Sequence, residues 1–184
     1  FEVEIMVAAL GWLLFFVTAF GLRVVFPLMA REGKVSWWLM SIGMGRGKII
    51  GDKLKAALIL GLPLVLISSM VWLIMPFEMT RLLWMFAFTG VLVISLVLLL
   101  NLWGMISPLF KLADQPDKVS TSMSGLMALG VSLIIIAWSV FTANKALENG
   151  NLDYVTIVAG VGMGTLMVGV SYWLGRMRIS KYEF

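Results

Sequence analysis

The chain has 184 residues, of which 61% are hydrophobic and 13% are charged, and its formal net charge is +4. Ordinary soluble domains are about 45–50% apolar and about 25% charged, so the composition argues against a water-soluble globule. The sequence contains neither Cys nor His. Their absence excludes disulfide scaffolds, thiolate clusters, Cys–His nucleophile pairs and His-ligated haem. We therefore expect no catalytic residues, no metal site and no cofactor in this chain.

Five apolar stretches are each about long enough to cross a bilayer. A hydrocarbon core about 30 Å thick requires about 20 residues of helix. The stretches contain no Asp, Glu, Lys or Arg and cover residues 5–22, 56–75, 82–106, 125–143 and 155–174. They lack the alternating pattern of membrane barrel strands. The sequence therefore predicts an all-α fold: a polytopic membrane helix bundle of five transmembrane helices, with residues 1–184 forming a single transmembrane domain.

Basic residues concentrate on one side of these predicted spans. Twelve of the 14 Lys and Arg residues follow the first, third and fifth spans. The other side holds Arg81 and Lys145, together with the acidic residues Glu2, Glu4, Glu78, Glu148 and Asp153. Because Lys and Arg are enriched in cytoplasmic loops, we predict an outside N-terminus and a cytoplasmic C-terminus. A bacterial or archaeal inner membrane is the expected location.

The predicted cytoplasmic loop, residues 24–55, is long, basic and rich in glycine. Trp37 and Trp38 lie among cations, which is typical of the headgroup layer. Residues 35–44 therefore form a short interfacial helix, or the two tryptophans simply anchor the membrane boundary. The glycines of residues 43–48 do not fit a phosphate-binding loop, which requires G-x-x-x-x-G-K-[ST] after a strand. A flexible turn beside a basic anchor is the favoured interpretation.

Two stretches of the chain are distinctive beyond their composition. The first is FPLMAREGKVSWWLM, residues 26–40, followed by Lys53 at the start of the next apolar stretch. The second is PLFKLADQPDK, residues 108–118, followed by the small residues of positions 120–125. Both stretches resemble segments of ABC-2 type exporter permeases, and they occur in the order found in that family. The resemblance covers nearly the whole chain, which is similar to the C-terminal half of such a permease.

The resemblance implies the transmembrane permease subunit of an ATP-driven exporter, with ATP hydrolysis in a separate ATP-binding cassette subunit. The family is built from paired six-helix halves. We therefore expect a gene product that is longer at its N-terminus, or a companion permease chain. No nucleic acid is expected as a partner. The loop 24–55 is the expected contact with the ATPase, through Arg31, Glu32, Lys34, Trp37, Trp38, Arg46 and Lys48.

Few polar groups lie within the predicted spans. Asn101, Ser68 and Ser69 are expected to form hydrogen bonds across helices. Glycines at Gly160, Gly164 and Gly169 would give the fifth span a flat face for close helix packing. No span contains an ionisable residue, which disfavours an ion-coupled carrier.

The alternative to a permease is a structural accessory subunit that packs within a larger membrane protein complex and transports nothing. The absence of catalytic motifs and the short chain favour this alternative. The large basic loop favours the permease, because a passive subunit has no need of a protruding contact surface.

Overall fold

The computed structural model of the chain describes residues 2–28, 46–74, 78–106 and 116–148, and the separate positions 162, 165, 166, 169 and 173. No strand occurs within these ranges. The helices are α1 (Glu2–Val24), α4 (Arg46–Ile74), α5 (Met79–Ile106), α6 (Pro116–Ser120) and α7 (Met123–Glu148). An all-helical fold is therefore confirmed for the described part of the chain.

Four of these helices are long and apolar enough to cross a membrane, over Glu2–Val24, Gly51–Ile74, Met79–Met105 and Met123–Leu147. They correspond to the first four predicted spans and indicate an integral membrane protein. The predicted fifth span, residues 155–174, lies outside the described ranges apart from the separate positions. A helix forms all its backbone hydrogen bonds within itself, which explains why apolar segments of this length take helical form in lipid.

Helix α4 extends further toward the N-terminus than the apolar stretch that predicted it. It begins at Arg46, whereas the sequence placed residues 46–55 in the loop. The reason is that an uncharged stretch marks only the part of a helix that lies in hydrocarbon. Residues 53–55, KLK, are good helix formers and continue the helix past that part. Pro63 also lies within α4, where it is exposed.

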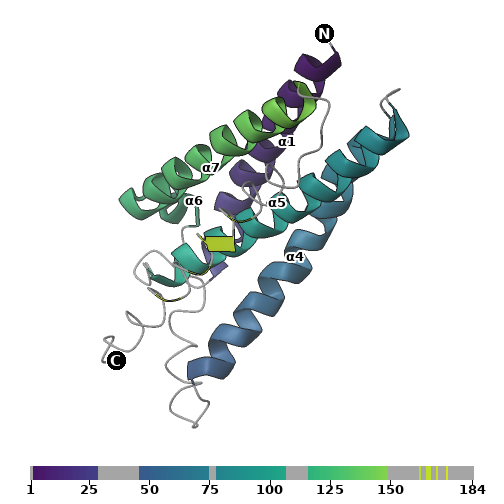
Figure 1. Ribbon diagram of the computed structural model, residues 1–184. Helices are drawn as coiled ribbons and strands as arrows, with labels where there is room; N and C mark the ends of the chain where they lie inside the picture. Colours follow the sequence, from purple (N-terminus) through teal and green to yellow (C-terminus); the bar gives the residue numbers. More distant parts are fainter. Residues whose placement is uncertain are drawn as a thin grey trace.

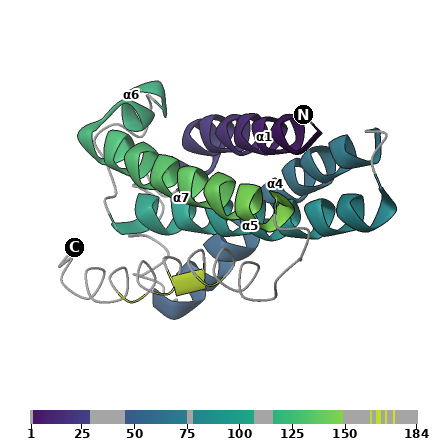
Figure 2. The ribbon, with the colours of Figure 1, turned by 45° about the horizontal axis from the view of Figure 1, so that its top comes forward.

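Helix α5 lies at the centre of the arrangement, in contact with α1, α4 and α7. It runs beside α4 over most of its length, and α1 runs beside α7 (Figure 1). Both views place the first turn of α1 near the last turn of α7, so these two helices are antiparallel (Figure 2). Of the residues in the most apolar part of α5, 56% are buried. The corresponding fraction in the most apolar part of α4 is 28%. Helix α4 is therefore the most peripheral of the four.

The core is formed by apolar side chains from α1, α4, α5 and α7, and α4 contributes the fully buried Ala57 and Trp72. Leu10, Leu14, Leu92 and Leu96 are all at most 1% exposed. Equally large apolar side chains cover the exterior, including Trp12, which is 65% exposed. An apolar exterior is unfavourable in water but matches the hydrocarbon of a bilayer.

Glycines allow α5 to approach its neighbours closely. A Cβ atom added at Gly104 would collide with the backbone carbonyl oxygen of Phe26, which follows α1. A Cβ atom at Gly61 of α4 would lie 3.0 Å from a methyl group of Val97. Close approach at small residues is a usual basis of helix association in lipid, where water supplies no hydrophobic driving force.

Candidate functional site

Basic residues of the described helices gather at one end of the bundle. The end of α1, the start of α4, the end of α5 and the short helix α6 all lie toward this end, where α6 contacts α1 and α7 (Figure 1). We define the basic end by its cations, which are Arg23, Arg46, Lys48, Lys53, Lys55 and Lys118. The opposite end carries Glu2, Glu4 and Glu78 beside the cations Arg81 and Lys145. The basic end also holds Asp117 and Asp52, which pairs with Lys55 at 3.8 Å, but among the described residues cations outnumber acidic residues only at this end.

A buried hydrogen bond joins α4 to α5 near the basic end. The side-chain Nδ2 of Asn101 donates to the backbone oxygen of Lys53 at 3.3 Å. Asn101 is 1% exposed and Lys53 is 8% exposed. Burial of a polar side chain is tolerated when it forms hydrogen bonds. This bond therefore fixes the position of α4 along α5 at the point where α4 emerges into the basic end.

Other buried polar groups form hydrogen bonds within one helix or across the same two helices, but the buried hydroxyl of Ser69 has no hydrogen-bond partner among the described residues, contrary to expectation, and the same holds for Thr18. The Ser68 hydroxyl donates to the Leu64 carbonyl at 2.6 Å, within α4. The indole Nε1 of Trp72 in α4 donates to the Thr89 hydroxyl in α5 at 2.8 Å. Within the described ranges no group of three or more acidic, Cys or His side chains is placed to hold a metal ion.

Most residues of the expected ATPase contact lie outside the described ranges, namely Arg31, Glu32, Lys34, Trp37 and Trp38. Arg46 is the first residue of α4, and Lys48, in its first turn, is exposed. The contact surface therefore stays a prediction. What the structure adds is that its last two members belong to a membrane-spanning helix instead of a loop.

Of the residues expected in helix packing, Asn101 joins α4 to α5, whereas Gly160 and Gly164 lie outside the described ranges. Gly169 is exposed, and a Cβ atom added there would meet no atom within 4 Å. The tightest described approach of a glycine to a residue distant in the chain is instead that of Gly104 to Phe26. Sequence reasoning missed it because every span contains glycine and nothing in the sequence pairs Gly104 with Phe26.

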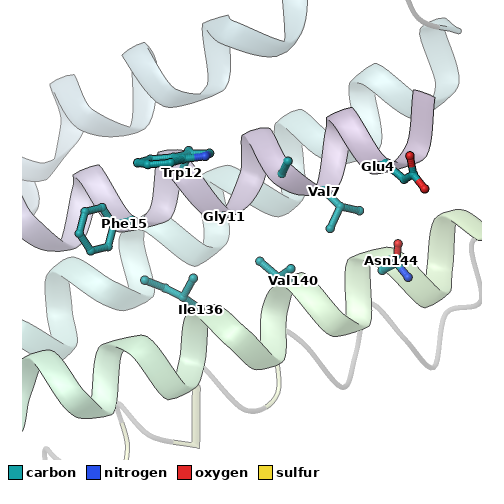
Figure 3. A pocket seen from close by; sticks show the side chains of 9 residues that line it. Glu4, Val7, Gly11, Trp12, Phe15, Ile136, Val140 and Asn144 are labelled. Atoms are coloured by element: carbon teal, nitrogen blue, oxygen red, sulfur yellow. The ribbon is translucent and has the colours of Figure 1, made fainter. Parts of the chain in front are cut away.

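An apolar groove of about 600 Å³ lies between α1 and α7 (Figure 3). Its α1 wall includes Val7, Trp12 and Phe15, and its α7 wall includes Ile136 and Val140. Two polar side chains line it at the end where α1 starts, Glu4 and Asn144. No sequence motif indicated this groove, because it combines residues from the two ends of the described chain.

Comparisons with protein-family models, with curated proteins and with solved structures find no match for this chain. The resemblance to ABC-2 type permeases therefore rests on the two stretches of sequence quoted above. The structure identifies the coarser class, a helical protein with four helices of membrane-spanning length and composition.

Proposed function

We propose that this chain is the transmembrane permease subunit of an ATP-driven exporter of the ABC-2 type, and that a separate ATP-binding cassette subunit hydrolyses the ATP. The observation that carries the proposal is the gathering of cations at the basic end. The segment that resembles the family's cytoplasmic loop, residues 26–40, lies in the chain between the end of α1 and the start of α4, which both belong to this end. The positive-inside rule makes such an end cytoplasmic, where an ATPase would bind.

The mechanism we propose uses α4 as the moving element. This helix is continuous from Arg46 to Ile74, so a displacement of its start is carried along its length. It is also the least buried of the four long helices. Its main packing partner is α5, so it can shift without separating α1 from α7. The ATPase would push on the loop and the first turns of α4, and the hydrogen bond between Asn101 and Lys53 would define the resting position.

A second permease half completes the proposed transporter, as a preceding part of the same polypeptide or as a companion chain. The apolar exterior leaves room for such a half. On α1, the rings of Trp12, Phe15 and Phe16 lie 6.0–6.3 Å apart between centroids and are all at least 43% exposed. The same exposed face would also suit an accessory subunit within a larger complex, which is the alternative function.

Copurification separates the two functions. We expect an ATP-binding cassette subunit among the proteins that copurify with the chain in mild detergent, as identified by mass spectrometry. Membrane partners without any ATPase would favour the accessory subunit.

Charge reversal in the loop tests the coupling itself. In the copurified complex, Arg31→Glu combined with Lys34→Glu should remove the stimulation of ATP hydrolysis that the permease confers, because the loop would no longer bind its partner. The matched control reverses two cations of the opposite end, Arg81→Glu with Lys145→Glu, and should retain the stimulation. Both variants must insert into the membrane at the wild-type level. Full stimulation in the Arg31 and Lys34 variant would refute the assigned contact.

A further inference from the structure

Among the side chains that the structure describes, Lys53 is the one charged group that is buried, at 8% exposed. It lies in the membrane-spanning part of α4, Gly51–Ile74, beside the buried amide of Asn101 in α5. An ionisable residue within a membrane span is costly, and such residues usually mark a functional site. The proposed movement of α4 uses only the backbone oxygen of Lys53, so the role of its side chain is still open.

A row of small apolar residues continues from Lys53 toward the middle of the membrane. Lys53, Ala57 and Gly61 follow one another at intervals of four residues, so they lie on one face of α4. All three are buried. A Cβ atom at Gly61 would lie 3.0 Å from a methyl group of Val97, which shows that this face packs against α5. The face combines a cation at the membrane boundary with an apolar row in its interior, and these features match the head and tail of an anionic amphiphile.

The interface between α4 and α5 is held differently at its two ends. At the end away from the cations, the fully buried Trp72 donates to the Thr89 hydroxyl at 2.8 Å. Near the basic end, Asn101 donates to the backbone oxygen of Lys53 at 3.3 Å. Beyond this bond the start of α4 lies apart from the end of α5 in both views (Figures 1 and 2). An outward swing of α4 about Trp72 would therefore open the interface at the basic end.

We infer that the interface between α4 and α5 opens at the basic end to bind an anionic amphiphile with a phosphate or carboxylate head and an alkyl tail. The ammonium of Lys53 and the amide N–H groups of Asn101 donate hydrogen bonds to the head. The tail lies along Ala57 and Gly61. As the site of an exported substrate it rests on the proposed function, whereas binding itself requires only this chain in a bilayer.

The test uses the full chain in phosphatidylcholine nanodiscs without an ATPase, so its result does not depend on coupling. Two probes carry the same alkyl tail with a diazirine and differ only in the head, which is a phosphate or a neutral hydroxyl. After illumination, mass spectrometry of peptides measures the adducts. We expect the phosphate probe to label the peptides around Ala57 and Val97 about tenfold more than the hydroxyl probe, because hydrogen bonds to a charged group are the stronger ones. Competition by unlabelled alkyl phosphate and by phosphatidylglycerol, in separate samples, shows whether the site takes a free amphiphile or an anionic phospholipid.

A pair of lysine variants tests the role of the buried cation. Lys53→Met keeps a long side chain but removes its charge, so the two probes should label the site equally. Lys55→Met is the matched control, because Lys55 is exposed and pairs with Asp52 at 3.8 Å, and it should keep the preference for phosphate. Equal labelling by the two probes in the wild-type chain, or loss of the preference in both variants, would overturn the inference.

A disulfide lock tests the opening of the interface. The Cβ atom of Val97 lies 3.5 Å from a Cβ atom placed at Gly61, a separation that suits a disulfide, and the chain has no native Cys. The variant Gly61→Cys with Val97→Cys should bind the phosphate probe when reduced and lose most of the adducts when oxidised. Unchanged labelling of the oxidised chain would place the amphiphile elsewhere. Failure of the disulfide to form would refute the contact on which the site is built.

Discussion

Replacing Gly104 by Ala is expected to lower the free energy of unfolding of the bundle by about 1–3 kcal/mol, the usual cost of overpacking a core. The added Cβ atom would collide with the carbonyl oxygen of Phe26. That oxygen belongs to the backbone, so it cannot rotate away as a side chain would. The turn after α1 is itself fixed by the burial of Val25 and Phe26, which are at most 1% exposed. The end of α5 must therefore move away from α1.

Gly130→Ala in α7 is the matched control for this substitution. Gly130 is exposed, and a Cβ atom added there would meet no atom within 4 Å. Alanine is the better helix former, so the stability of this variant should stay the same or rise slightly. Reversible unfolding in mixed micelles measures both variants. Equal stability of Gly104→Ala and the wild-type chain would show that the two backbones are further apart than described here.

Replacing Trp72 by Ala is expected to cost about 3–5 kcal/mol, the usual range for truncating a large buried aromatic side chain. Trp72 is 0% exposed, and its indole Nε1 donates to Thr89 across the interface between α4 and α5. Truncation would leave a cavity at this interface and remove a hydrogen bond between the helices. We expect α4 to separate from α5 at a lower denaturant concentration, measured by energy transfer between labels on the two helices.

Trp12→Ala is the corresponding control, because Trp12 is 65% exposed on the outer face of α1. Lipid chains can occupy the space that its side chain leaves, so no cavity remains. The stability should change by less than a third of the Trp72→Ala effect. Both variants are measured in the isolated chain, without the proposed second half, and comparable losses would mean that Trp12 packs against another segment of the same chain.

The uncharged stretches of the sequence were sufficient to predict the described membrane-spanning helices. Charges are costly in hydrocarbon, so stretches such as 82–106 and 125–143 mark where α5 and α7 cross it. The helix ends were less predictable, since Arg46 and Lys48 belong to α4 although both are charged. A helix continues into the headgroup layer as long as its residues favour it, and charge alone does not mark where it stops.

The contacts between helices could not be predicted from the sequence. In soluble helices one apolar face predicts what is buried, but these helices are apolar on all sides. Gly104 and Gly130 therefore look alike in the sequence, although one touches backbone and the other faces open space. The groove likewise could not be predicted, because Glu4 and Asn144 line the same groove only through the antiparallel packing of α1 and α7.

The central claim is that the basic end of the bundle lies in the cytoplasm, where an ATPase can reach the loop between α1 and α4. Single cysteines at Lys48 and Glu78 test it directly, because both residues are exposed and the chain has no native Cys. A membrane-impermeant maleimide should label Glu78→Cys in intact cells and Lys48→Cys only after permeabilisation. Labelling of both positions from the same side, or of Lys48→Cys alone in intact cells, would contradict the account.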